Sequence, residues 1–393
     1  MRPLTDEEQV YRSSINLDKE ISALRIAFGN LPDTRASNSS HQLSDVLMSG
    51  FAMFSLKYPS LLSFEQQTGM EKNNLKNIFG IEKSISDVQL RRILDKIDPN
   101  FIRELFPKKF DSLNKAGLLE EFGLQIGKET YHLVSCDGVQ HFSSKTVSCE
   151  CCLKKEHKDG STTYHHNMLC AVLVHPKKRE VFVMDVEPII QQDGVTKNDC
   201  ERNAAKRMQV NFAKSYENYS KTMRFLFVED ALYANVPHIK ELLHHGFDYL
   251  LNVKPGSHGT LFSLFQEYQM PLEGVKKGKI GTFSTIDDDK IHHDFEYING
   301  ISLCKSSPDL VVNFVKYTQT DKKGKKTTFT WVTNIELSQD ILMVVMRAGR
   351  ARWKIENETF NTLKNLGYHF EHNYGHGKDH LARSEERRVG KEC

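Results

Sequence analysis

Two apolar segments in the middle of the chain each lead directly into an aspartate. Residues 133–136 precede Asp137, and residues 225–228 lead through Glu229 to Asp230. A short apolar run is typical of a buried strand, and the sheet holds an acidic side chain at the end of such a strand in position. A turn or helix-capping role is the alternative for either aspartate alone, because aspartate is common after strands. The pair therefore predicts a sheet with carboxylates at its rim.

The segments around these aspartates alternate between predicted strands and helices. A strand hairpin follows the first aspartate, and then come a helix, the second strand, another helix and a third strand. These elements lie at residues 168–174 with 181–186, 199–219, 225–228, 236–245 and 249–253. This order is that of an RNase H-like core. We therefore predict an α/β fold with an RNase H-like catalytic core.

The remaining segments predict additions to this core. At 393 residues the chain exceeds the usual size of a single core, so two or three packed units are expected. We predict a helical N-terminal domain suited to DNA binding at 1–125, the first part of the core at 126–256, a mostly β insertion at 257–335, the final core helices at 336–382, and a non-native tail at 383–393. The insertion is far longer than an ordinary connection.

The tail at 383–393 has neither apolar periodicity nor a packing pattern. It resembles the translation of a sequencing adapter joined in frame, and we exclude it from the predicted fold. On this interpretation Cys393 is not native, and the natural chain continues past about residue 382. A natural charged tail is the alternative.

Composition and charge limit the surroundings and partners of the protein. Hydrophobic residues make up 39% and charged residues 26%, as in an ordinary globular protein. The net charge of +2 permits DNA binding without predicting it, since nucleic-acid binders are recognised by basic clusters on one face. No apolar segment has the length of a signal-peptide core or a membrane span. We expect a cytoplasmic protein that has no membrane partner and no small-molecule substrate.

A third acid lies on a helix that is predicted from residue 340 through 364, with a break near Gly349. Arg352 and Glu356 are four residues apart and share one face of this helix. A solvated ion pair is the alternative to a functional role. Apolar neighbours such as Trp353 and Phe360 predict that much of the helix is buried, where a carboxylate needs a partner or a metal ion.

The helix resembles the signature helix of a large group of bacterial insertion-sequence transposases, which is named for its Tyr, Arg, Glu and Lys. Four further segments are similar to blocks of that group, and they lie at residues 135–138, 229–235, 366–368 and 371–377. The resemblance covers about residues 45–382. It implies a DDE active site in which Asp137, Asp230 and Glu356 hold two magnesium ions, for which manganese can substitute. It also implies that Arg352 and Lys364 contact DNA phosphates and that a homodimer assembles on the DNA.

The chain departs from the pattern of this group at two positions. The signature tyrosine falls at Gly349, so that contact is absent or supplied elsewhere. Lys364 lies one residue further from Glu356 than usual, which leaves Glu358 as a rival third acid. We prefer Glu356, because its interval from Arg352 is kept and Glu358 points about 200° away on an α-helix.

Cysteines and histidines crowd into the predicted hairpin at 149–166. Cys149, Cys152, His157 and His165 have the composition of a tetrahedral zinc site. Such a zinc ion would be structural and would secure a loop beside the first aspartate. A reduced hairpin without metal is the alternative, because the spacing is not that of a standard zinc finger.

These features together predict a DNA transposase. Its expected reaction is metal-dependent cleavage of the element ends, followed by attack of the freed 3′-hydroxyl on DNA by in-line displacement. An RNase H-like nuclease that cuts DNA without joining strands is one alternative. An inactive or domesticated transposase that acts only as a DNA-binding protein is the other.

Overall fold

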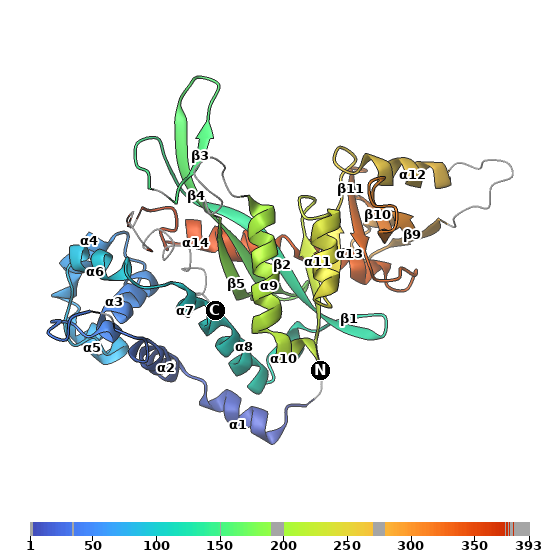
Figure 1. The fold of residues 1–393 in the computed structure, drawn as a ribbon. Coiled ribbons are helices and arrows are strands. Elements are labelled where there is room, and N and C mark those ends of the chain that lie inside the picture. The colour runs from blue at the N-terminus through green and yellow to red at the C-terminus, as the bar shows by residue number, and fades with distance from the viewer. Residues whose placement is uncertain are drawn as a thin grey trace.

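The computed structural model describes residues 3–33, 35–149, 151–189, 200–269 and 280–373, together with residues 375, 377 and 380. The chain forms a mixed α/β fold around one eleven-stranded sheet with helices on both faces (Figure 1). The predicted tail at 383–393 lies outside the described residues. Within the described part of the chain, no helix combines the length and the apolar character needed to cross a membrane.

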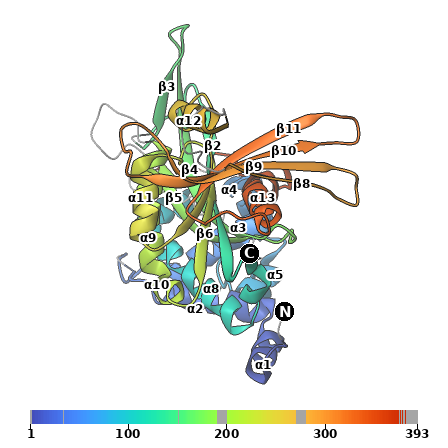
Figure 2. The same cartoon turned by 90° about the vertical axis from the view of Figure 1, so that its right-hand side faces the viewer.

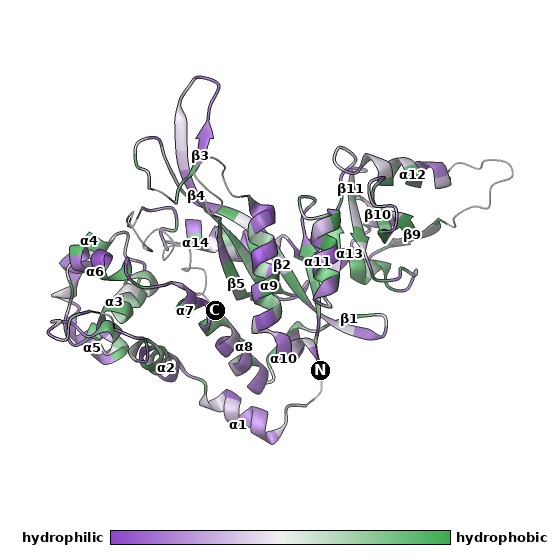
Figure 3. Cartoon of the chain, in the orientation of Figure 1, coloured by the Kyte–Doolittle hydropathy of each residue, from purple (hydrophilic) through white to green (hydrophobic). Residues whose placement is uncertain are grey.

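Five strands form the part of the sheet that carries the predicted acids, in the spatial order β5-β4-β2-β6-β7. Their bounds are β2 (Glu129–Ser144), β4 (Thr162–Val174), β5 (Phe182–Ile189), β6 (Arg224–Glu229) and β7 (Asp248–Asn252). β4 is antiparallel to both β2 and β5, whereas β6 is parallel to β2 and β7 is parallel to β6. Figure 3 shows hydrophobic residues along the middle of this sheet, as expected of strands covered on both faces.

Successive side chains of each strand point to opposite faces of the sheet. The covering helices are α9 (Glu201–Ser215), α11 (Val236–His244) and α13 (Leu342–Ala351). Phe225 and Phe227 of β6 pack in the apolar cluster of α9 and α11, whereas Leu226 and Val228 pack in that of α13. This is the period of two expected of a strand. The apolar run before Asp230 is therefore buried on both sides.

The predicted β insertion extends the same sheet. It contains α12 (Gly259–Gln269), β8 (Gly281–Ile286), β9 (His292–Ser302), β10 (Val311–Thr320) and β11 (Lys326–Thr333). β11 pairs antiparallel with β7, where Trp331 is opposite Asn252, and β10, β9 and β8 follow outward. Figure 2 shows these strands as an arm that leaves one side of the molecule. The insertion is thus continuous with the core sheet.

Helices precede the sheet, as predicted for the N-terminal region, and have an apolar cluster of their own that includes Leu47, Phe64 and Leu90. They are α1 (Asp6–Ser14), α2 (Leu17–Gly29), α3 (Leu43–Ser55), α4 (Leu61–Thr68), α5 (Lys72–Phe79), α6 (Asp87–Leu94), α7 (Asn100–Arg103) and α8 (Leu105–Lys115). α8 reaches the sheet, because Phe110 packs in the cluster of α9 and α11. Shorter elements are η1 (Leu119–Phe122), β1 (Leu124–Ile126), β3 (Leu153–Glu156) and α10 (Glu217–Ser220).

The last helical segment, predicted at residues 340–364 with a break near Gly349, consists of three elements. α13 ends at Ala351, a turn carries Arg352, and a π-helical turn, η2 (Ile355–Phe360), leads into α14 (Asn361–Asn365). Gly349 itself stays helical, and the break follows two residues later, close to the position predicted from the sequence. A Cβ on Gly349 would lie 2.6 Å from atoms of the Trp331 indole. Position 349 therefore leaves no room for a side chain unless Trp331 moves.

Candidate active site

Asp137 and Asp230 lie on neighbouring parallel strands. β2 and β6 pair as far as Ser135 opposite Val228, and continuing this register by two residues sets Asp137 beside Asp230. Asp230 directly follows β6, as predicted. Asp137 lies inside β2 and not at its end, because β2 continues to Ser144 through its pairing with β4. Strand residues therefore precede and follow Asp137 in the sequence.

Arg352 links Asp137 to the third predicted acid. Its Nη1 lies 3.2 Å from Asp137 Oδ2 and 3.0 Å from Glu356 Oε1. Arg352 is 8% exposed, and Ser135 Oγ donates a hydrogen bond to its carbonyl oxygen at 3.0 Å. This bond fastens the turn before η2 to the strand that carries Asp137. Sequence segments 215 positions apart therefore meet at one cationic side chain.

The surroundings of Asp137 disfavour its charged form. Burial raises the pKa of Asp137, the Arg352 guanidinium opposes this shift, and the Glu356 carboxylate adds to it, so that the pKa reaches about 7. Burial is thus the largest cause of the raised pKa, and the Arg352 guanidinium offsets it only in part. A further cation close to the Asp137 carboxylate would favour its ionised form.

Glu201, which the sequence analysis did not single out, is a fourth acid at this place. It is the first residue of α9, and a Cβ on Gly138 would come within 2.6 Å of its carboxyl carbon. Burial and the charge of Asp230 raise the pKa of Glu201, against a hydrogen bond from Tyr233 Oη at 3.4 Å. A glutamate in a first helical turn is common because it suits the helix dipole, so its position in sequence carried no functional signal.

The structure separates the two candidates for the third acid. Glu356 reaches Arg352 and acts on Asp137, whereas Glu358 Oε2 lies 3.3 Å from Nε of Arg179, whose side chain is 84% exposed. The two glutamates therefore point to different surroundings. The geometry favours Glu356 as a partner of the aspartates.

Carboxylate oxygens are the ligands that magnesium and manganese prefer, so the donor set suits these cations. The pKa of Asp137 is raised chiefly by burial and further by the Glu356 carboxylate, and a bound cation would lower it again. Asp137, Asp230 and Glu356 do not all have oxygens within 4.8 Å of one another, and in the described residues that spacing is met only by a cysteine–histidine group. Among the described residues, the three acids therefore do not form a group in mutual contact.

The residues predicted to bind DNA differ in their accessibility. Arg352 is buried against the acids, so its partners in this structure are carboxylates and not a phosphate site on the surface. Lys364 Nζ lies 2.8 Å from Oε1 of Glu371, whose side chain is 62% exposed. Trp353, which the sequence predicted to be buried, is 52% exposed beside the Arg352 guanidinium. An exposed indole thus lies beside Arg352, whereas Lys364 is paired with an exposed glutamate.

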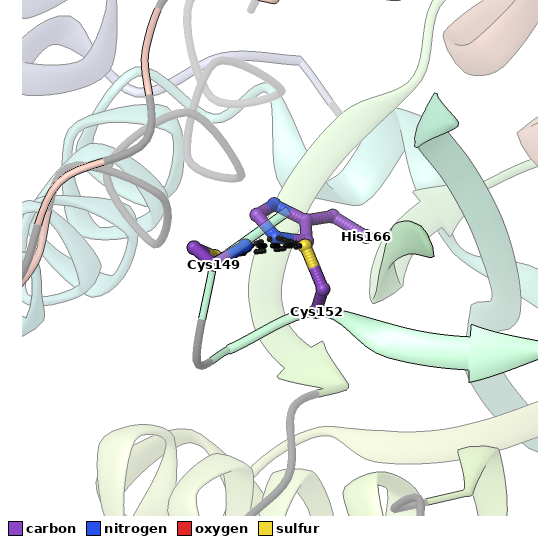
Figure 4. A group of neighbouring side chains, drawn as sticks. All are labelled: Cys149, Cys152 and His166. Atoms are coloured by element: carbon purple, nitrogen blue, oxygen red, sulfur yellow. Dashed lines mark hydrogen bonds between the residues drawn. The ribbon is translucent and has the colours of Figure 1, made fainter. Parts of the chain in front are cut away.

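A second cluster joins the loop before β3 to β4. Cys149 Sγ lies 3.6 Å from Cys152 Sγ and 3.3 Å from His166 Nε2, and Cys152 Sγ lies 3.1 Å from the same nitrogen (Figure 4). A hydrogen bond from Cys149 lowers the pKa of the Cys152 thiol. Cysteine sulfur and histidine nitrogen at these distances form a group able to hold a metal ion.

The two histidines predicted as zinc ligands lie outside this cluster. His157 Nε2 is 2.6 Å from Thr163 Oγ1 instead of near the cysteines. His165 precedes His166 on β4, and consecutive strand residues point to opposite faces, so only one of them can reach the cysteines. His165 instead lines a shallow depression of about 300 Å³ together with Glu201. The histidine beside the cysteines is therefore His166.

A buried polar chain supports β6 behind the acids. Glu229 Oε2 lies 2.6 Å from His238 Nε2, and the Gln209 side-chain nitrogen lies 3.2 Å from the same ring. Both Glu229 and His238 are buried, so this contact satisfies a carboxylate that would otherwise be costly. It connects the residue before Asp230 to α9 and α11.

Comparisons with known proteins identify no family for this chain and one weak structural similarity. No protein-family model matches the sequence, and no curated protein matches it. Among solved structures, the chain is similar to a NurA nuclease from Sulfolobus solfataricus, at 12% sequence identity and a TM-score of 0.24, with 65% of this chain and 86% of that chain covered. A likeness at this level carries no argument about fold or activity.

Proposed function

We propose that the protein is a metal-dependent DNA transposase with a DDE active site on an RNase H-like core. The observation that carries the proposal is the contact of Arg352 with both Asp137 and Glu356. Asp137 inside a central strand and Glu356 on a C-terminal helical turn thus bind the same guanidinium group. Asp230 follows the neighbouring strand. The Arg352 contact supports the DDE assignment that the transposase resemblance of the sequence implies.

The strand order supports the RNase H-like part of the proposal. Three antiparallel strands in the order β5-β4-β2 are continued by β6 and β7, each parallel to β2. α9 lies between β5 and β6 in sequence, and α11 lies between β6 and β7. The insertion follows β7 and precedes α13, so it separates the second aspartate from the third acid in the chain.

The roles of the residues follow from their contacts. Asp137, Asp230 and Glu356 would hold two magnesium ions, with Glu201 as a further oxygen donor beside Asp230. Bound there, the ions would neutralise charge on the attacking and leaving oxygens and lower the pKa of a water molecule. Arg352 would keep Asp137 and Glu356 at a defined separation and balance part of their charge.

The protein surface beside the acids would position the DNA. Lys364 can exchange its exposed partner Glu371 for a phosphate, since a surface ion pair is weak. Trp353 offers an exposed aromatic face for stacking on a base. Strand joining requires two ends, and the proposal therefore includes a homodimer on DNA.

The test is a cleavage assay with magnesium on a plasmid that carries the genomic DNA flanking this reading frame. Glu356→Gln is expected to lower the rate of strand cleavage by at least about a hundredfold, because a ligand carboxylate is lost while the side-chain size is kept. DNA binding, measured by gel shift in calcium, is expected to remain.

Glu358→Gln is the matched control, and it is expected to cleave within about twofold of the wild type. Loss of cleavage in Glu358→Gln with retention in Glu356→Gln would reverse the assignment of the third acid. Cleavage without joined products, in an assay that contains paired ends and target DNA, would reduce the proposal to an RNase H-like nuclease.

A further inference from the structure

We propose that Cys149, Cys152 and His166 bind a structural zinc ion that fastens the loop before β3 to the sheet. Their ligand atoms lie 3.6, 3.3 and 3.1 Å apart. This site does not depend on the proposed transposase activity, because none of its residues belongs to the acid cluster.

The three distances are close to those of three corners of a zinc tetrahedron. Zinc–sulfur bonds of about 2.3 Å and zinc–nitrogen bonds of about 2.0–2.1 Å at tetrahedral angles separate two sulfurs by about 3.8 Å and a sulfur from a nitrogen by about 3.6 Å. The observed separations are shorter by a few tenths of an ångström, which small side-chain rotations can supply. The proposal assigns these three protein ligands and no fourth.

The backbone around the cysteines also suits a bound metal. The amide of Cys149 donates to Cys152 Sγ at 3.3 Å, and the amide of Cys152 donates to the carbonyl oxygen of Cys149 at 3.2 Å. These bonds close a tight turn that directs both sulfurs to one point. An amide that donates to sulfur stabilises the thiolate, which is the form that binds zinc.

The cluster holds a loop that otherwise has little burial. Residues 145–148 are exposed, whereas Cys152, directly before β3, is fully buried. His166 is opposite Phe142 on β2, the strand that carries Asp137. A zinc ion here would therefore anchor the loop at the base of the projecting β3–β4 arm to β4, which pairs with the strand of the first acid (Figure 1).

The first test uses the wild-type protein, purified with its thiols reduced. After equilibration with zinc and removal of the excess, about one zinc ion per chain is expected by elemental analysis. Cobalt in place of zinc is expected to give a thiolate charge-transfer band and the visible bands of a tetrahedral ion. Reduced protein that retains less than about a tenth of an equivalent, or cobalt without a thiolate band, would overturn the proposal.

Variants then test the ligands. Cys149→Ser, Cys152→Ser and His166→Asn are expected to lose the bound zinc. His165→Asn and Cys304→Ser are matched controls for the loss of a histidine and of a cysteine, and they are expected to keep it. Retention of zinc by His166→Asn together with its loss from His165→Asn would overturn the assignment.

Chelation of the wild type gives a readout that does not require a variant to fold. Removal of zinc is expected to raise the rate of tryptic cleavage after Lys145 by at least about tenfold, because the exposed loop loses its anchor, and added zinc is expected to reverse the change. Unchanged cleavage would show that no metal holds this loop. Glu356→Gln should keep the zinc content of the wild type. Loss of zinc binding can therefore be distinguished from loss of the proposed activity of Asp137, Asp230 and Glu356.

Discussion

Arg352 is a buried cation between two acids that would otherwise repel each other. Its Nη1 lies within 3.2 Å of both carboxylates, and its backbone carbonyl accepts a hydrogen bond from Ser135. An arginine is well suited to this buried position because its guanidinium stays charged and one nitrogen, Nη1, donates to both carboxylates. The resemblance to transposases implied a phosphate contact for this residue, whereas its position gives it a role in organising the acids.

The raised pKa of Asp137 predicts a pH-dependent affinity for magnesium. Below its pKa of about 7, Asp137 carries a proton that a cation must displace, whereas above pH 7 the carboxylate is available. The affinity should therefore rise about tenfold per pH unit between pH 5.5 and 7 and level off above about pH 8. Calorimetric titration with magnesium measures this dependence. Asp137→Asn should bind weakly with little dependence on pH, and a flat profile in the wild type would contradict the prediction.

The exposed Trp353 predicts a fluorescence signal for DNA binding. The chain has two tryptophans, and Trp331 is 1% exposed whereas Trp353 is 52% exposed. Short double-stranded DNA should quench the emission of Trp353 if a base or the sugar–phosphate backbone covers the indole. Trp331→Phe should keep the response and Trp353→Leu should lose it. Quenching that persists in Trp353→Leu would place the DNA elsewhere.

At the scale of elements, the π-helical turn η2 decides where the third acid points. Such turns usually occur as single insertions within α-helices, often at functional sites. Here the turn follows a break at Arg352 and sets Glu356 toward β2 and Glu358 toward Arg179. An α-helical wheel suggests the same choice between the glutamates, but it contains neither the break nor the π-helical turn.

The contact of α13 with β11 predicts a steric limit at Gly349. A Cβ at this position would lie 2.6 Å from Trp331 Cε2, so Gly349→Ala should destabilise the fold by about 1–3 kcal/mol. Gly29→Ala is the matched control, because a Cβ there meets no atom within 4 Å. Urea denaturation measures both. Equal effects at the two positions would mean that Trp331 moves aside at no cost.

At the scale of the molecule, a buried charge cluster ties the N-terminal helices to the sheet. Arg103 of α7 binds Asp185 and Glu187 of β5 at 2.6 Å, and Arg207 of α9 binds Glu187 at 2.7 Å. Both carboxylates are 5% exposed. The helical region and the core are therefore one folded body at this contact.

This cluster predicts a large effect of one substitution. Arg103→Met should lower the free energy of unfolding by about 3–5 kcal/mol, because two buried carboxylates lose their nearest cation. Arg179→Met removes an arginine whose side chain is 84% exposed and should change stability by less than about 0.5 kcal/mol. Chemical denaturation of both variants provides the measurement. A loss shared equally by the two would show that burial of the cluster is unimportant.

The predictions from sequence were most successful for individual elements. The apolar runs before Asp230 and around residues 168–174 are strands, and residues 236–245 are a helix ending near His244. Such patterns are local, since each element must bury one face or stripe with its own period. The prediction that Asp137 lies at the end of a strand was less accurate, because the end of β2 depends on how far β4 continues to pair with it.

The residues that meet at the candidate sites could not be predicted from local sequence patterns alone. Glu201 begins α9 far from either aspartate in sequence, and only packing brings it to Gly138 and Asp230. His166 and not His165 meets the cysteines because the pairing register selects one face of β4. A one-residue change of register exchanges the two faces of a strand, and no short segment contains that information.

The sequence by itself determined the order of strands and helices and the acids that end or interrupt them, because apolar periodicity and residue chemistry are properties of short segments. Only the tertiary structure decided which of these residues meet. Arg352 faces Asp137, the insertion continues the core sheet through β11, and Gly349 leaves room for Trp331. Each of these contacts joins segments far apart in the chain, and each depends on strand register and side-chain packing across the whole core.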